Sequence, residues 1–186
     1  MAVALLLTTA TASAAKRDGH ALQAMLQASS PGSTVACPNN KYGNPACTVD
    51  GVEVEAGDDC TLNMSFGGVT ADRGTTLAEG FKPSGATPVA HVGRRQLLCV
   101  LATQREAGVL IRALVKVVPT KTVKYCKGSE MCKGADTPVE WKRPASGVAC
   151  TLKPDGHYTG DCATGWVDGK DIEEYSMGLK PEDDGA

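Results

Sequence analysis

The chain has 186 residues, 42% of them hydrophobic, and its 19 basic and 21 acidic residues leave a formal net charge of −2. This length fits a single domain, and the charge balance lacks the basic excess typical of nucleic-acid-binding proteins. No stretch beyond the first fifteen residues is apolar enough to cross a membrane, so no transmembrane segment is expected.

The first fifteen residues, MAVALLLTTATASAA, carry no charged side chain. An apolar run followed by small residues is typical of the hydrophobic region and cleavage site of a secretory signal peptide, the alternative being a buried N-terminal helix. We therefore expect a signal peptide over residues 1–15 and one secreted, extracellular domain over 16–186. The following Lys16-Arg17 pair is either a processing site or an ordinary soluble boundary.

Eight cysteines follow the predicted signal peptide. An even number in that context indicates a disulfide-rich protein from an oxidising compartment. A structural zinc site needs thiolates at short spacing. Because the chain has no CxxC pair and only three histidines, we expect disulfides, no metal site and no cofactor. The predicted disulfide cysteines are Cys37, Cys47, Cys60, Cys99, Cys126, Cys132, Cys150 and Cys162.

Residues 19–29, GHALQAMLQAS, come next and predict a helix. Leu22, Met25 and Leu26 recur at the spacing of one helical face, and Asp18 can cap the helix start. This is the single helix that the sequence indicates.

The remaining elements are predicted to be strands. Alternating residues over 61–66 and 121–126 indicate half-buried strands, and the apolar run 96–103 indicates a buried one. The apolar run 109–118 also fits a helix through Leu110 and Leu114, but its β-branched residues and the preceding Gly108 favour a strand. The short connection 104–108 between the two runs predicts a hairpin. The fold class is therefore mainly β (α+β), a disulfide-braced antiparallel β domain with one short N-terminal helix.

Residues 47–60, CTVDGVEVEAGDDC, contain a strong turn signal. The Asp-Gly pair at 50–51 predicts a two-residue hairpin, and a second turn at 56–59 would extend it to a three-strand meander. Cys47 and Cys60 would then flank a third strand, about 9 Å apart. A disulfide needs Cα atoms within about 7 Å, so we do not expect these two cysteines to pair.

Residues 150–162, CTLKPDGHYTGDC, look similar, with Cys-Thr at the start and Asp-Cys at the end. Here the turn at 153–157 contains Pro-Asp-Gly, in which each residue favours a tight reversal. The resulting hairpin brings Cys150 near Cys162, and we expect them to form a disulfide. The other cysteine spacings do not match, which favours a compositional similarity over an internal repeat.

Positive charge is concentrated in residues 94–143, which hold eleven basic and four acidic residues. A cationic surface of this kind attracts anionic partners. The alternative is that the acidic segment 144–186 folds over it and neutralises it. The predicted partner-binding residues are Arg112, Lys116, Lys121 and Lys124. The full basic set is Arg94, Arg95, Arg105, Arg112, Lys116, Lys121, Lys124, Lys127, Lys133, Lys142 and Arg143.

A glycosylation sequon occupies Asn63-Met64-Ser65. Asn63 falls on the predicted solvent face of its strand, so it should be accessible to a glycosyltransferase. If the source is eukaryotic, we expect a glycoprotein with a glycan on Asn63; in a bacterium the motif carries no such meaning.

Catalysis finds little support in the sequence, because G-x-S-x-G and H-E-x-x-H are both absent. The alternative to a binding protein is a small secreted hydrolase or nuclease that uses His91 and His157 for acid–base chemistry. No set of nucleophile, base and orienting residue can be named, so we predict no catalytic residues. A third reading is an inhibitor that presents the rigid loop 153–157.

The predicted signal peptide, the size and the cysteine content resemble those of small secreted cysteine-rich proteins, a broad class of surface antigens, microbial effectors and inhibitors. The resemblance assigns no site residues. Our leading hypothesis is a non-catalytic binding protein, effector-like or surface-antigen-like. It would engage an extracellular or host protein, or an anionic glycan, through residues 94–143.

Overall fold

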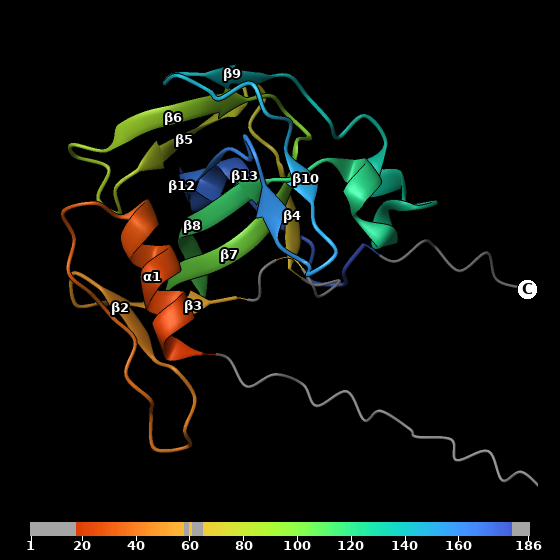
Figure 1. The fold of residues 1–186 in the computed structure, drawn as a ribbon. Coiled ribbons are helices and arrows are strands. Elements are labelled where there is room, and N and C mark those ends of the chain that lie inside the picture. Colours follow the sequence, from red (N-terminus) through yellow and green to blue (C-terminus); the bar gives the residue numbers. More distant parts are fainter. Residues whose placement is uncertain (1–17, 58–59, 61–64, 180–186) are drawn as a thin grey trace, which may run out of the picture.

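The computed structural model describes residues 18–57, 60 and 65–179 (Figure 1). The predicted signal peptide, the Lys16-Arg17 pair and the sequon asparagine Asn63 lie outside these residues. The described strands are β1 (Val35–Ala36), β2 (Cys47–Val49), β3 (Val52–Ala56), β4 (Phe66–Val69), β5 (Thr75–Glu79), β6 (Thr87–Val92), β7 (Leu97–Glu106), β8 (Val109–Val117), β9 (Val139–Trp141), β10 (Thr151–Leu152), β11 (Tyr158–Thr159), β12 (Thr164–Asp168) and β13 (Ile172–Glu174). The helices are α1 (Gly19–Ser29) and the one-turn 3-10 helices η1 (Thr120–Thr122), η2 (Lys124–Cys126), η3 (Glu130–Cys132) and η4 (Gly169–Asp171).

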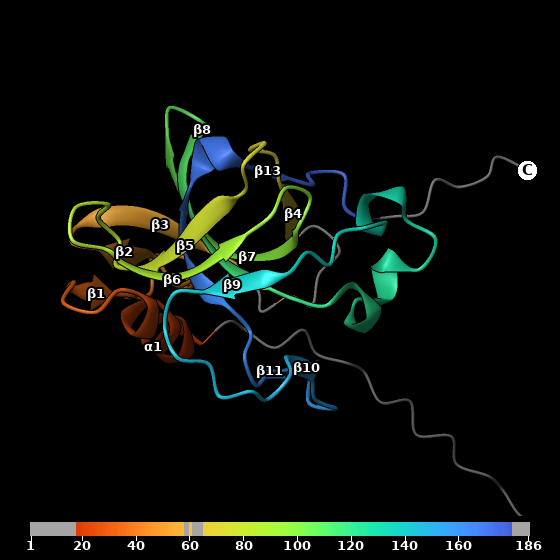
Figure 2. The ribbon, with the colours of Figure 1, turned by 90° about the horizontal axis from the view of Figure 1, so that it is seen from above.

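The predicted fold class, a disulfide-braced antiparallel β domain with one short helix, is confirmed. The main sheet follows the order β1-β2-β3-β7-β8-β12-β5-β6-β9, with β4 paired to β7 and β13 to β4. A separate small sheet is formed by β10 and β11. Figure 2 shows α1 and the β10–β11 hairpin on the same side of the main sheet, as they are in Figure 1.

Helix α1 covers the residues that the sequence predicted. The Asp18 carboxylate accepts a hydrogen bond of 2.9 Å from the His20 backbone N–H, which satisfies one free donor of the first turn. Leu26 is fully buried, and Leu22 and Met25 pack beside it. The helix therefore covers one face of the sheet with the apolar stripe read from the sequence.

The hairpin of β7 and β8 forms the centre of the sheet and confirms the two strands predicted from the apolar runs. Strand β7 continues to Glu106, so the turn is shorter than the predicted connection. Ala107 and Gly108 form it with φ values of 48° and 82°, as two-residue hairpin turns require.

Both faces of β7 are buried from Leu97 to Gln104, and β8 is buried from Ala113 to Val115. Along β7, Leu97, Cys99 and Leu101 join a hydrophobic cluster on the α1 side, whereas Leu98 and Val100 join a second cluster on the opposite face. The first cluster also contains Phe66, Leu114 and Trp166, and the second contains Val89, Val115 and Val167. Burial on both faces explains why these strands read as continuous apolar runs.

Four disulfides pair all eight cysteines. The predicted bond between Cys150 and Cys162 is confirmed, as is the expectation that Cys47 and Cys60 do not pair with each other. Each bond restricts the unfolded chain, which typically stabilises a fold by about 2–4 kcal/mol. The pairs are Cys37–Cys47, Cys60–Cys99, Cys126–Cys132 and Cys150–Cys162.

The geometry predicted for residues 47–60 is only half correct. The Asp-Gly turn places Cys47 opposite Val54, as expected. The three-strand meander is wrong, because the second neighbour of β3 is β7 and not the segment that carries Cys60. Cys60 is instead bonded to Cys99, the third residue of β7. The spacing of residues 47–60 could not indicate that β3 and Cys60 both meet the distant strand β7.

The strand predicted over 121–126 is also wrong, because η1 and η2 occupy these residues. Pro119 precedes the segment, and the Cys126–Cys132 bond closes a loop with a sequence separation of 6. So short a loop favours compact turns over an extended strand. Of the strand predicted over 61–66, Phe66 begins β4, and residues 61–64 lie outside the described part of the chain.

Candidate functional site

Almost half of the basic residues between 94 and 143 are neutralised by ion pairs. Such exposed pairs add little stability, but they reduce the charge that a partner would meet. Among the described residues, only one of these carboxylates, Glu174, belongs to the acidic segment 144–186. The pairs are Arg94–Asp72, Arg105–Glu55, Arg105–Glu174, Lys133–Glu130, Lys142–Glu140 and Arg143–Glu79.

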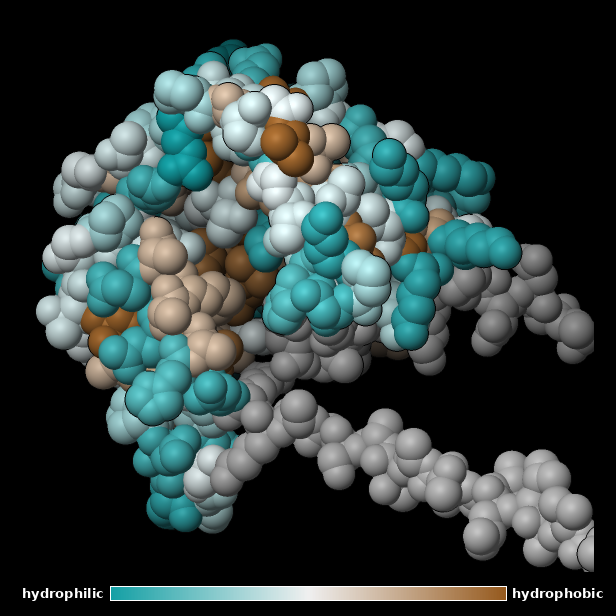
Figure 3. All heavy atoms as spheres, viewed as in Figure 1, coloured by the Kyte–Doolittle hydropathy of each residue, from teal (hydrophilic) through white to brown (hydrophobic). Residues whose placement is uncertain are grey.

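Residues 120–133, which we call the lysine lobe, hold three basic residues outside these pairs together with the paired Lys133. Four exposed lysines line one hollow of about 550 Å³ in this segment: Lys121, Lys124, Lys127 and Lys133. Within the described ranges, no carboxylate forms an ion pair with the first three. Hydrophilic side chains gather on the right of Figure 3, over the green one-turn helices of Figure 1. The lobe is therefore a local cationic surface.

The backbone of the lysine lobe is held in place by covalent and polar contacts. The Cys126–Cys132 disulfide joins η2 to η3. The Thr120 N–H and hydroxyl donate to the two carboxylate oxygens of Asp136, at 2.9 and 2.6 Å. Val123 and Cys132 are buried in the main core. The lysines thus extend from a fixed scaffold, which limits the backbone entropy that binding would cost.

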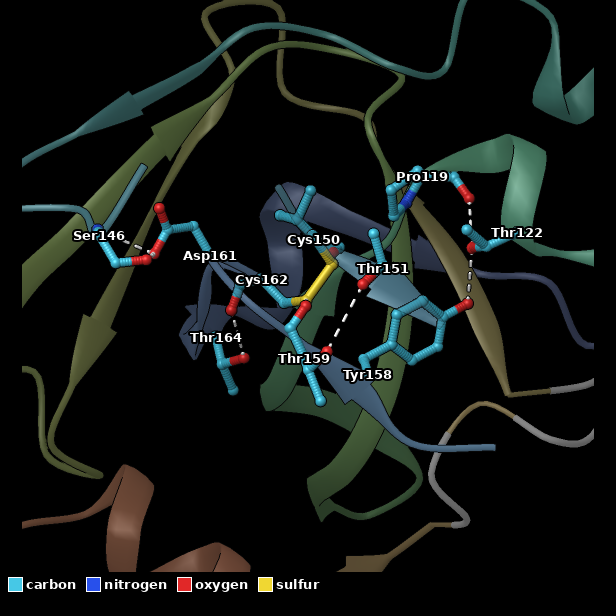
Figure 4. The surroundings of a disulfide bond; sticks show 11 residues. Pro119, Thr122, Ser146, Cys150, Thr151, Tyr158, Thr159, Asp161, Cys162 and Thr164 are labelled. Carbon is cyan, nitrogen blue, oxygen red and sulfur yellow. Dashed lines mark hydrogen bonds between the residues drawn. A yellow bond between two sulfur atoms is a disulfide. The ribbon is translucent and has the colours of Figure 1, made fainter. Parts of the chain in front are cut away.

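The β10–β11 hairpin packs beside the lysine lobe (Figure 4). The Tyr158 hydroxyl lies 2.9 Å from the Thr122 hydroxyl, and burial raises the pKa of Tyr158. The Lys116 ammonium lies 5.9 Å from the centre of the Tyr158 ring, within cation–π range. Lys116 is thereby placed next to the lobe, as one of the predicted partner-binding residues.

Asp161 fixes the other side of this hairpin. Its carboxylate accepts hydrogen bonds from the Ser146 N–H at 3.1 Å, the Ser146 hydroxyl at 2.8 Å and the Gly147 N–H at 2.7 Å. These bonds hold the pKa of Asp161 below its ordinary value. Together with the Cys150–Cys162 disulfide, they tie the hairpin to the preceding loop (Figure 4).

Arg112, which the sequence grouped with the lysines, lines a different cavity. This cavity has a volume of about 580 Å³ and is also lined by Trp166, Asp168 and His91. Burial lowers the pKa of Arg112, whereas the charge of Asp168 opposes that shift. Among the four predicted partner-binding residues, only Lys121 and Lys124 therefore line the lobe hollow.

His91 and His157, the candidate acid–base pair, belong to separate sites. His91 Nε2 donates to the Arg73 carbonyl at 3.0 Å, and its Nδ1 lies 3.2 Å from the Thr76 hydroxyl. His157 sits in the exposed turn between β10 and β11 and does not line the cavity that contains His91. The geometry gives no support to a hydrolase that uses both residues.

Lys127 and Lys133 are members of the site that the sequence did not single out. A lysine stands at every third residue from 121 to 127. The strand predicted there would have placed successive lysines of this series on opposite faces, so it gave no indication that they line one hollow. The short spacing between Cys126 and Cys132 was the signal that could have indicated a compact loop instead.

Other classes of site are not seen in the described part of the chain. It contains no group of three or more His, Cys, Asp or Glu side chains that could hold a metal ion. No helix within it is long and apolar enough to cross a membrane. Comparison with known proteins finds no match to any protein-family model, curated protein or solved structure.

Proposed function

We propose that this chain is a non-catalytic extracellular binding protein whose lysine lobe docks an anionic polysaccharide. The observation that carries the proposal is the gathering of four exposed lysines around one hollow on a disulfide-braced backbone. The four disulfides fit an extracellular setting, because such bonds persist in oxidising compartments.

The composition of the lobe favours a polysaccharide over a protein partner. Centres of protein–protein interfaces are enriched in aromatic residues and arginine and depleted of lysine. Among the described residues of the lobe, Met131 is the one large apolar side chain that is exposed, at 45%. A lysine ammonium is a compact charge on a flexible stem, which suits sulfate or carboxylate groups repeated along a chain.

The strength of such binding should depend strongly on salt. The lobe holds four lysines and one glutamate, a net charge of +3 on a chain whose overall charge is −2. Charges exposed to solvent are screened over about 8 Å at physiological ionic strength. The lobe therefore acts as a local patch that attracts polyanions despite the negative charge of the whole molecule.

Chromatography of the secreted, disulfide-bonded protein on heparin-agarose tests the proposal. The variant Lys121→Gln/Lys124→Gln/Lys127→Gln should elute at about half the NaCl concentration that the unchanged protein needs, because most of the unpaired charge is lost. The matched control Lys41→Gln/Lys142→Gln/Lys153→Gln removes the same charge from exposed lysines elsewhere and should elute close to the unchanged protein.

Two outcomes would overturn the proposal. An equal shift in both triple variants would mean that heparin responds to net charge and not to the lobe. Retention on an immobilised acidic protein without retention on heparin would assign the lobe to a protein partner.

A further inference from the structure

The cavity beside Arg112 opens where two strands of the main sheet separate. Strands β12 and β5 are paired through one register position only, Trp166 opposite Ala78. Beyond this pair lies the cavity of about 580 Å³, a volume in the range of small-molecule sites. It is distinct from the hollow of the lysine lobe, with which it shares no lining residue.

Aromatic rings support the Arg112 side chain. The guanidinium carbon lies 6.0 Å from the ring centres of both Phe81 and Trp166. The two rings pack edge to face at 4.9 Å. Trp166 is fully buried, and its Nε1–H donates to the Ser30 hydroxyl at 2.9 Å. These contacts hold the cation by cation–π attraction but supply no oxygen that could accept its hydrogen bonds.

One donor of Arg112 is left without a partner. Its Nη1 is buried and has no acceptor among the described residues. Asp168 faces Arg112 directly across β8 and β12, but its carboxylate pairs with Lys170 Nζ at 2.9 Å and accepts the Lys170 N–H at 3.2 Å. A buried donor that lacks an acceptor is costly, and Arg112 also lines the cavity, so a ligand oxygen that reached this guanidinium would relieve that cost.

The other walls limit what that acceptor can be. Ile111 and Pro83 offer apolar contact to the body of a ligand. Asp168, Asp171 and Arg73 also line the cavity, and with Arg112 their charges balance, which favours a singly charged anion over a multiply charged one such as phosphate. A single carboxylate matches the planar fork of a guanidinium in two parallel hydrogen bonds.

We propose that this cavity binds a small organic monocarboxylate with an apolar body, its carboxylate on Arg112 and its body against Ile111 and Pro83. The site is independent of the lysine lobe, since the two share no lining residue and this one relies on a half-buried guanidinium in place of several exposed ammonium groups.

Titration of the ¹⁵N-labelled protein with sodium phenylacetate, followed by NMR, tests the proposal. The Trp166 indole signal, assigned with a Trp141→Phe variant, and the Ile111 and Thr76 amide signals should shift saturably. Phenylacetamide has the same body without the charge and should bind at least tenfold more weakly.

Variants of Arg112 give a second arm to the test. Arg112→Lys, which keeps the charge without the fork, should weaken phenylacetate binding about tenfold, and Arg112→Met should abolish it. The control Arg94→Met changes an arginine outside the cavity and should bind normally. Equal affinity of the unchanged protein for phenylacetate and phenylacetamide would overturn the proposal, whatever the Arg112 variants do. Equal shifts with inorganic phosphate would also overturn the carboxylate assignment.

Discussion

The lysine lobe and the Arg112 cavity hold positive charge in opposite ways. In the lobe, several ammonium groups are exposed around one hollow, and the backbone beneath them is braced by a disulfide. In the cavity, one guanidinium is half-buried over aromatic rings with a donor unsatisfied. Solvated charges attract weakly and over a distance, whereas a desolvated charge binds at short range and selects by shape.

This difference shows that a basic segment in a sequence need not be one surface. Residues 94–143 read as a single cationic region, yet the fold divides them into ion pairs, an exposed lobe and a cavity wall. The division depends on the neighbours that β12 and η1 to η3 bring, which lie outside any local pattern. Each prediction below tests whether the two sites are as independent as this arrangement implies.

The largest effect should come from the ring beneath Arg112. Trp166→Ala should lower the free energy of unfolding by about 3–5 kcal/mol, because it removes a fully buried aromatic side chain. Lys124→Ala, in the exposed lobe, should change it by no more than about 0.5 kcal/mol. Urea denaturation of both variants measures the contrast. Comparable losses would mean that the lobe is as much a part of the core as the cavity.

Removal of the lobe disulfide should come next in size. The variant Cys126→Ser/Cys132→Ser lacks the disulfide that closes this loop. Its free energy of unfolding should be lower by about 2 kcal/mol in the chain-entropy account. Retention on heparin should fall although no charge changes, because the lysines lose their fixed scaffold. The control Cys37→Ser/Cys47→Ser removes a disulfide outside the lobe and should leave retention unchanged. Normal retention of the first variant would show that the lysines act without a fixed arrangement.

A smaller effect should appear in the dependence of stability on pH. Hydrogen bonds from Ser146 and Gly147 lower the pKa of Asp161 below its ordinary 3.8. The stabilisation by this carboxylate is present above that ordinary value and is lost as the pH falls through the lowered pKa. Asp161→Asn should therefore be less stable than the unchanged protein at pH 7, and the difference should shrink below about pH 4. A difference that is constant with pH would contradict the charge-assisted role.

The smallest effect should come from the acidic C-terminus. Glu182→Gln/Asp183→Asn/Asp184→Asn tests the alternative that the segment 144–186 neutralises the basic region. Elution from heparin should move to a slightly higher NaCl concentration, since exposed charges are screened. This rise should be smaller than the fall in NaCl concentration expected for Lys121→Gln/Lys124→Gln/Lys127→Gln. A gain larger than that loss would mean that this segment controls access to the lobe.

The local elements were largely predictable from the sequence. The helix at 19–29, the Asp-Gly hairpin at 50–51 and the Cys150–Cys162 bond each depend on residues close together in the chain. Periodicity and turn chemistry read such features directly. Non-local pairing was not predictable, as the pairing of β3 with β7 shows, because nothing near Ala56 in the chain indicates which distant strand it meets.

The candidate sites show the same limit. Lys121 and Lys124 were identified by charge alone and lie together in the lobe. Arg112 was identified by the same charge but belongs to another cavity, because Trp166 and Asp168 reach it from a strand more than fifty residues later. Charge can therefore be read from the sequence, whereas its solvation depends on the tertiary fold.

The most direct test of the proposed function is the salt dependence of binding to a heparin oligosaccharide. A plot of the logarithm of Kd against the logarithm of NaCl concentration reports the number of ionic contacts through counterion release. We expect a slope of about three for the unchanged protein and a slope of about one for Lys121→Gln/Lys124→Gln/Lys127→Gln, which keeps Lys133. The same slope in both proteins would contradict the assignment of the lysine lobe as the binding surface.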